Sequence, residues 1–421
     1  MSDDSIRKTA LVLAGGGLTG AVYEVGALRA IDDLLVDRTV NDFDVYVGTS
    51  AGALVGSLLA NGITPEDMMR TLDGSHPDLL PIERRHIFNV KRSELLKSTL
   101  ALPKKVSHSW WEYIRKQDMT FFDLAWSLLG VLPSGLYDGM ALDRYLRDVL
   151  VQRERCNCFQ GLEKPLYIVA TDLDSGERMV FSHETPDVPI STAVAASSAV
   201  PLVYRPVRIG EREYVDGGLR GNASLDIAIE AGATMIVCIN PMVPFDNHDH
   251  RAIPAMATSN GRQAHYLSES GVNFIANQVT RILTHASIRY HVKQLRRAHP
   301  EVDIILIEPR PDDTEMFFYN PMRYSARLEI ARYGFESATL GLEEEYPLYK
   351  ATLARHGIPI TRRMVIRELQ EIQSATDSEQ RREVLRRVLS ARQMRLEQRS
   401  GNPISKLARA LAQLELLLEE L

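Results

Sequence analysis

The feature that most limits the fold is the alternation of strand-like and helix-like segments over the first 60 residues. Residues 9–14 and 43–47 are short apolar runs of strand length. Each run leads into a glycine-containing turn and then into a segment with helical or small-residue spacing, at 21–35 and 51–60. Strands alternating with helices predict a parallel sheet covered by helices. We therefore expect a three-layer α/β/α fold with a mainly parallel central sheet.

The same alternation continues to about residue 345, which predicts one domain over residues 1–345. Within it, residues 64–135 are first irregular and polar and then aromatic, so they are expected to form an insertion. Residues 346–421 lack strand signals and predict a helical C-terminal appendage. Its end carries apolar residues at three-four spacing, which favours docking on the main domain or assembly into a homo-oligomer, with membrane contact as the third alternative. These residues are Ile404, Leu407, Leu411, Leu414, Leu418 and Leu421.

Composition narrows the possible environments and partners. A chain of 421 residues with 45% hydrophobic and 25% charged residues is typical of a soluble globular protein. A net charge of -6 provides no overall attraction to nucleic acid, so no such partner is expected. The N-terminus lacks the pattern of a secretory signal, and the longest apolar stretch, residues 119–133, is too short for a membrane-spanning helix. We expect a cytoplasmic protein, with peripheral membrane contact left open.

Cysteine usage predicts neither a disulfide framework nor a metal site. The chain has three cysteines, an odd number. Cys156 and Cys158 form a close pair, but a second pair or a histidine cluster at ligand spacing is missing. Reduced thiols and no bound metal are therefore expected.

A serine in a glycine-rich turn is the strongest chemical signal. Gly48-Thr49-Ser50-Ala51-Gly52 lies between an apolar strand and a small-residue helix. A nucleophile elbow has this arrangement, because the serine sits on a sharp turn and the glycines two residues away let the strand and helix approach. We interpret Ser50 as a candidate nucleophile, with Gly48 and Gly52 shaping the turn.

A glycine loop precedes the first predicted helix. Gly15, Gly16 and Gly17, followed by Gly20, contain the G-x-G-x-x-G spacing of dinucleotide-binding turns. That motif needs an acid at the end of the second strand, where this chain has the Ser50 turn instead. The favoured interpretation is that the amides of Gly16 and Gly17, with that of Ala51, stabilise an oxyanion. A purely structural role for these glycines is the alternative.

An aspartate followed by two glycines could supply the base. Asp216-Gly217-Gly218 ends a predicted strand, and a parallel strand would bring Asp216 beside the elbow. A carboxylate can activate a serine directly if burial raises its pKa. A Ser-Asp-His triad is the alternative, and the candidate histidines that follow Asp216 in the required order are His248, His250, His265, His285 and His291.

Four motifs in order, GGGLTG, GTSAG, ASSAVP at 196–201 and DGG, resemble those of the patatin-like phospholipases, over roughly residues 8–240. The resemblance implies a patatin-like fold and hydrolysis of acyl esters in lipids or phospholipids, without metal or other cofactor. It makes Ser50 the nucleophile, Asp216 the base, Gly15–Gly17 the oxyanion loop and residues 196–201 a helix and turn that pack beneath the site. Thr19 departs from the family, which usually has a basic residue there. A non-catalytic scaffold and, through the glycine spacing, a nucleotide-dependent oxidoreductase remain as alternatives.

Aromatic residues concentrate in the expected insertion. Such side chains favour the membrane interface, and Lys104 and Lys105 precede them. This segment is interpreted either as a lid or membrane-docking flap over the site or as a cap on the core. The residues concerned are Trp110, Trp111, Phe121, Phe122 and Trp126.

Overall fold

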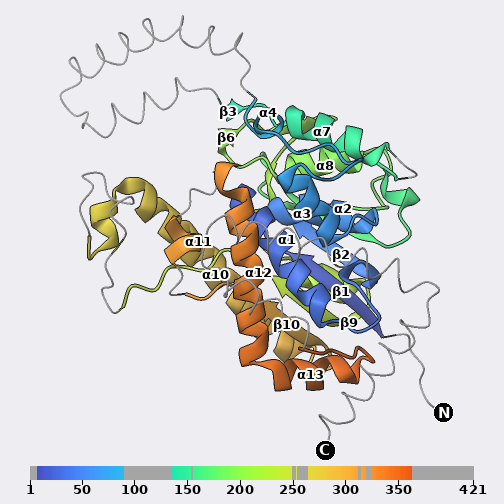
Figure 1. Ribbon diagram of the computed structural model, residues 1–421. Coiled ribbons are helices and arrows are strands. Elements are labelled where there is room, and N and C mark those ends of the chain that lie inside the picture. Colours follow the sequence, from blue (N-terminus) through green and yellow to red (C-terminus); the bar gives the residue numbers. More distant parts are fainter. Residues whose placement is uncertain are drawn as a thin grey trace, which may run out of the picture.

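The computed structural model describes residues 7–89, 134–152, 155–248, 253, 264–311, 314–318 and 324–362. Its centre is an eight-stranded sheet (Figure 1). The strands are β1 (Lys8–Leu13), β2 (Val45–Thr49), β4 (Leu166–Asp172), β5 (Arg178–Phe181), β7 (Val207–Ile209), β8 (Arg212–Asp216), β9 (Ala233–Ile239) and β10 (Asp303–Ile307). Their order is β10-β9-β1-β2-β4-β8-β7, with β5 also pairing with β4. The first five of these are mutually parallel, which confirms the mainly parallel sheet.

Helices cover both faces of this sheet. They are α1 (Gly17–Leu34), α2 (Ala51–Ala60), α3 (Pro65–Asp73), α4 (Arg84–Ile87), α7 (Met140–Leu150), α8 (Ile190–Ser197), α9 (Leu225–Glu230), α10 (Val272–Ala298), α11 (Thr314–Phe318), α12 (Arg327–Glu344) and α13 (Tyr346–Arg355). Successive strand residues point to opposite faces. In β1, Leu11 and Leu13 join a core that includes α1, α2 and α12, whereas Ala10 and Val12 pack with α9 and α10. The three-layer α/β/α fold is thus confirmed.

A close helix contact joins the two ends of the described chain. Helix α12 lies along α1 (Figure 1). A Cβ atom at Gly26 would lie 2.1 Å from the Ala331 carbonyl oxygen, and one at Gly334 would lie 2.5 Å from the Tyr23 carbonyl oxygen. The two backbones meet at these glycines because only hydrogen fits there.

Residues expected to lie in the insertion (64–135) and in the C-terminal region (346–421) also pack into the core around the sheet. Helix α3 has a capping box between Thr64 and Asp67 and buries Met68 and Met69 in the core, so these residues do not form an irregular insertion. Beyond residue 345, α13 packs into the same core and Ile360 bridges to Leu35. The aromatic segment and the C-terminal apolar stripe lie outside the described residues, and the domain division stays a prediction. No helix in the described ranges is long and apolar enough to cross a membrane.

The cysteine prediction was wrong for one pair. Cys156 and Cys158 form a disulfide in the loop between α7 and β4, with their Cα atoms 5.2 Å apart. Only one residue separates the two cysteines in the sequence, so their Cα atoms lie within the range that a disulfide needs. The expectation of reduced thiols rested on the number of cysteines in the chain, which says nothing about a bond between such near neighbours. Cys238, in β9, is a free and buried thiol.

Candidate active site

Ser50 lies in strained backbone between β2 and α2. Its φ and ψ are 54° and -117°, a backbone conformation that residues other than glycine rarely adopt. The flanking glycines permit the turn: a Cβ at Gly48 would lie 2.5 Å from the Gly52 carbonyl oxygen, and one at Gly52 would lie 2.2 Å from that of Leu13. This is the geometry expected of a nucleophile elbow.

Asp216 reaches Ser50 along a strand whose direction differs from the expectation. Strand β8 runs antiparallel to β4, not parallel as predicted. Asp216, the last residue of β8, pairs with Ala170 of β4. The neighbouring β4 residue, Val169, pairs with Thr49, the last residue of β2. The reversed strand therefore ends at the level where β2 ends, and the Ser50 hydroxyl donates a hydrogen bond of 2.5 Å to Asp216 Oδ2.

Asp216 is buried, with 7% of the residue exposed, and its carboxylate accepts hydrogen bonds from the Ser50 hydroxyl and the Gly218 amide. Burial raises its pKa to about 6, while the hydrogen bonds from the Ser50 hydroxyl and the Gly218 amide act in the opposite direction. The Gly218 amide donates to Oδ1 at 2.7 Å. Gly217 sits against the Val169 carbonyl, where a Cβ would lie only 2.2 Å from the oxygen. Both glycines of the motif thus help to position the carboxylate.

The hydroxyl of Ser50 meets this carboxylate directly, without an intervening imidazole. Two of the histidines considered for a triad have other partners: His285 lies 3.4 Å from Glu308 and His291 3.9 Å from Asp226. His248 and His265 are exposed, and His250 lies outside the described residues.

The glycine loop is fixed by a residue that sequence reasoning missed. Asn222 Oδ1 accepts a hydrogen bond of 3.0 Å from the Gly15 amide, and Asn222 Nδ2 donates one of 3.0 Å to the Gly15 carbonyl. The Gly15 amide is therefore engaged and differs from the donor role expected of the loop. Gly17 and Ala51 line the same cavity as Ser50 and begin α1 and α2, whose first amides lack acceptors within the helix. Gly16, the N-cap of α1, directly precedes Gly17.

Helix α8 supports the elbow from the other side. Ser197 Oγ accepts a hydrogen bond of 2.8 Å from the Ser50 amide and donates one of 2.6 Å to the Val169 carbonyl. Ser198 Oγ donates to the Ser50 carbonyl at 3.2 Å. The ASSAVP motif thus does more than pack beneath the turn, since its two serines bind both backbone groups of the strained residue.

An apolar cavity opens beside Ser50. Its lining combines the loop and elbow with side chains from α1, α2, α7 and α8 and nearby loops: Gly17, Leu18, Ala21, Ser50, Ala51, Leu54, Ile82, Ile87, Gly139, Leu142, Ala195, Ser198, Val200 and Tyr204. A second cavity, deeper between α1, α2, α3 and α7, shares Leu18, Ala21, Leu54 and Ile82 with it. The two cavities are therefore neighbours that share part of their apolar walls. The aromatic residues proposed for a lid lie outside the described residues.

Comparison with known proteins agrees with the motif analysis. The family model for patatin-like phospholipases matches residues 11–229, which confirms the resemblance. The probable lipid hydrolase 463L of Invertebrate iridescent virus 6 is 24% identical over 221 residues, covering 52% of this chain and 63% of that protein. YqhO of Bacillus subtilis is 25% identical over 223 residues, covering 50% and 63%. The chain thus spans less than two thirds of the length of these curated relatives.

Solved structures that match this chain include VipD from Legionella pneumophila. Its TM-score is 0.34 at 17% identity, covering 80% of this chain and 67% of VipD. Human GIVD cytosolic phospholipase A2 has a TM-score of 0.32 at 13% identity, covering 80% and 58%.

Proposed function

Since the chain belongs to the patatin-like phospholipase family, we propose that it is a serine hydrolase of carboxylic esters in lipids, of the phospholipase A or lysophospholipase type. The observation that carries the proposal is the hydrogen bond from the Ser50 hydroxyl to a buried carboxylate, made by a serine in strained elbow geometry. Backbone strain, a raised carboxyl pKa and an apolar cavity gather at this point, as is typical of catalytic sites.

The proposed reaction uses groups of the chain alone. Asp216 accepts the proton of Ser50 as Oγ attacks the ester carbonyl. The amides of Gly16, Gly17 and Ala51 stabilise the oxyanion, each contributing about 3 kcal/mol in the transition state. The protonated Asp216 then gives its proton to the departing alcohol, and a water molecule activated by the same carboxylate hydrolyses the acyl-enzyme.

The apolar cavity beside Ser50 and its apolar neighbour support an acyl chain as the group that is held during the reaction. Among the described residues, the linings of these cavities offer no cation for a headgroup. Thr19, at the position where the family usually has a basic residue, is 1% exposed and buried in α1. A fixed charge for a phosphate is thus absent from this position, and recognition is proposed to rest on the acyl chain.

Labelling with a fluorophosphonate probe and hydrolysis of a mixed lipid extract, read by mass spectrometry, test the proposal. Wild type should label and release fatty acid, Ser50→Ala should do neither, and Asp216→Asn should lose at least a hundredfold in rate. Ser75→Ala, an exposed serine, is the matched control. Full activity of Asp216→Asn disproves the assigned base. A folded wild type that neither labels nor hydrolyses indicates the scaffold alternative.

A further inference from the structure

We propose that the Cys156–Cys158 disulfide is a thiol-disulfide exchange site whose state controls the active-site elbow; this rests on the proposed function. The reactant is a dithiol, either a small molecule or a protein. Both cysteines are partly exposed. The third cysteine, Cys238, is fully buried. Because burial raises the pKa of its thiol well above the usual range, Cys238 is poorly reactive.

The loop is shaped around the oxidised pair. A Cβ at Gly161 would lie 2.5 Å from Cys156 Sγ and 2.9 Å from Cys158 Sγ, so the disulfide packs on a position that has no room for a side chain. The Cys158 amide donates to Cys156 Sγ at 3.2 Å. The backbone of the residue between them, Asn157, is therefore held in a small ring.

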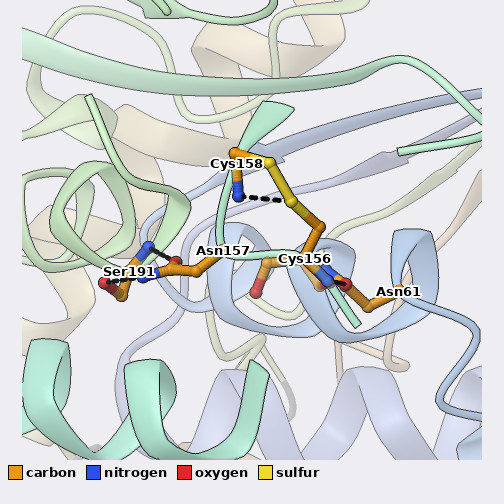
Figure 2. Close-up of a disulfide and its surroundings, with 6 residues drawn as sticks. Asn61, Cys156, Asn157, Cys158 and Ser191 are labelled. Carbon is orange, nitrogen blue, oxygen red and sulfur yellow. Dashed lines mark hydrogen bonds between the residues drawn. A yellow bond between two sulfur atoms is a disulfide. The ribbon is translucent and has the colours of Figure 1, made fainter. Parts of the chain in front are cut away.

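Asn157 uses this fixed position to cap α8 (Figure 2). Its carbonyl accepts a hydrogen bond of 3.1 Å from the Ile190 amide, and its Oδ1 accepts one of 2.8 Å from the Ser191 amide. Its Nδ2 donates to Ser191 Oγ at 2.9 Å. The N-cap of α8 is Pro189, which provides no side-chain cap of its own. Asn157 thus satisfies amides that a helix leaves without partners.

The same loop also holds the end of the elbow helix. The Cys156 amide donates a hydrogen bond of 2.9 Å to Asn61 Oδ1, and Asn61 is the C-cap of α2 (Figure 2). Helix α2 begins directly after Ser50, and the last turn of α8 leads to Ser197 and Ser198, which bind the Ser50 amide and carbonyl. The disulfide loop therefore contacts the far ends of the two short helices whose near ends hold the nucleophile.

Reduction proceeds by two exchanges. A thiolate of the dithiol attacks one cysteine sulfur, which breaks the Sγ–Sγ bond, forms a mixed disulfide and releases the other cysteine as a thiolate. The second thiol then displaces the bound cysteine, so that the dithiol becomes a disulfide and both cysteines end as thiols. Opening the ring frees Asn157 to leave α8. Asp143 still accepts from Ser191 Oγ and Thr192 Oγ1, so α8 loosens without detaching.

Turnover of a soluble butyrate ester tests the consequence. The full chain is assayed oxidised, after treatment with dithiothreitol and after reoxidation with oxidised glutathione. Losing the Asn157 cap should shift the equilibrium between the ordered and the loosened form of α8 about fivefold. The kcat/KM should therefore fall about fivefold on reduction and recover on reoxidation. Cys238→Ser should keep this response. The double variant Cys156→Ser, Cys158→Ser and the single variant Asn157→Ala should remain at the reduced level in all three conditions.

Hydrogen exchange separates this proposal from the proposed function. Reduction should speed exchange of the Ile190 and Ser191 amides in wild type but change neither in the double variant. If reduction speeds this exchange but the protein has no esterase activity, the link between the disulfide and α8 is supported and the proposed ester hydrolysis is contradicted. Equal exchange and equal kcat/KM in the oxidised and reduced wild type overturn the coupling, as does a redox response that survives in the double variant.

Discussion

At the scale of single residues, the proposed mechanism makes the activation of Ser50 depend on the protonation state of Asp216. Burial raises the pKa of Asp216 to about 6, and only the ionised carboxylate can accept the hydroxyl proton. We therefore expect kcat/KM for a soluble ester to be constant above about pH 7 and to fall about tenfold per pH unit below about pH 6. A pH profile of the wild type checks this. A rate that stays level down to pH 4.5 contradicts the role of this carboxylate.

The same carboxylate should lower stability at neutral pH. Its pKa rises from 3.8 to about 6 on folding, so the folded state binds the proton more tightly than the unfolded chain. The resulting stabilisation is complete below about pH 3.8 and is lost as the pH rises through about 6. Asp216→Asn has no such proton, so its stability relative to wild type should rise by roughly 2 to 3 kcal/mol between pH 4 and pH 7.5. Urea unfolding of both proteins at the two pH values measures it; a pH-independent difference contradicts the assignment.

Asn222 should act as a positioning residue for the glycine loop. Asn222→Ala removes both hydrogen bonds to Gly15, so kcat should fall about ten- to a hundredfold while KM changes less. Asn222→Asp keeps the acceptor for the Gly15 amide and should lose less. Steady-state kinetics, with thermal melting to confirm folding, provide the measurement. Asn247→Ala, which removes an amide on another loop, serves as control, and an unchanged kcat in folded Asn222→Ala refutes the role.

Local motifs marked Ser50 and Asp216 as candidate catalytic residues because each lies in a short glycine-containing turn at a strand end, and the structure brings the two side chains together. Asn222 was not predicted, since its partner Gly15 lies 207 positions away and nothing in the nearby sequence marks the contact. The serines of ASSAVP were expected only to pack, because a hydrogen bond to a distant strained backbone leaves no periodic signal. Residues defined by local geometry were therefore predictable, and residues defined by long-range contacts were not.

At the scale of elements, the strongly periodic or buried strands and helices were predicted within a few residues, but strand direction was not. The expected strand near Asp216 is β8, yet it runs antiparallel to β4. The short strands β3 (Gly135–Tyr137) and β6 (Leu202–Tyr204), which pair with each other, were missed. Three residues are too few to show alternation, and direction depends on how the chain returns to the sheet.

The contact between α1 and α12 gives a prediction about packing. Gly334→Ala would place a methyl group 2.5 Å from the Tyr23 carbonyl oxygen, so it should lower the free energy of unfolding by about 1 to 3 kcal/mol. Gly341→Ala lies in the same helix and meets nothing within 4 Å, so it should raise that free energy by up to about 1 kcal/mol. Urea unfolding measures both. Equal effects of the two substitutions contradict the close approach of the helices.

At the scale of the whole molecule, the three layers followed from the alternation in the first 60 residues, and two helices near the expected domain boundaries also pack into their core. Helix α3 carries enough polar residues to have been assigned to the insertion, although its buried methionines join the core. Helix α13 packs beyond the expected boundary because Tyr346, Tyr349 and Leu353 face inward. Together α1, α2, α3 and α7 enclose the deeper apolar cavity, so the shape of the proposed acyl site depends on packing between segments distant in sequence.

This arrangement predicts how substrate preference depends on the deeper cavity. Leu58 lines that cavity but not the one beside Ser50. We expect a long acyl chain to extend from the cavity beside Ser50 into this neighbouring one, where the larger ring of Leu58→Phe reduces the space. The kcat/KM for a laurate ester should therefore fall about tenfold, while that for a butyrate ester stays within about twofold. Leu348→Phe, at a position 59% exposed, is the control and should change neither. Parallel initial rates on the two esters measure the ratio. If Leu58→Phe lowers both rates equally, the deeper cavity does not hold the acyl chain, and selection by chain length must arise elsewhere.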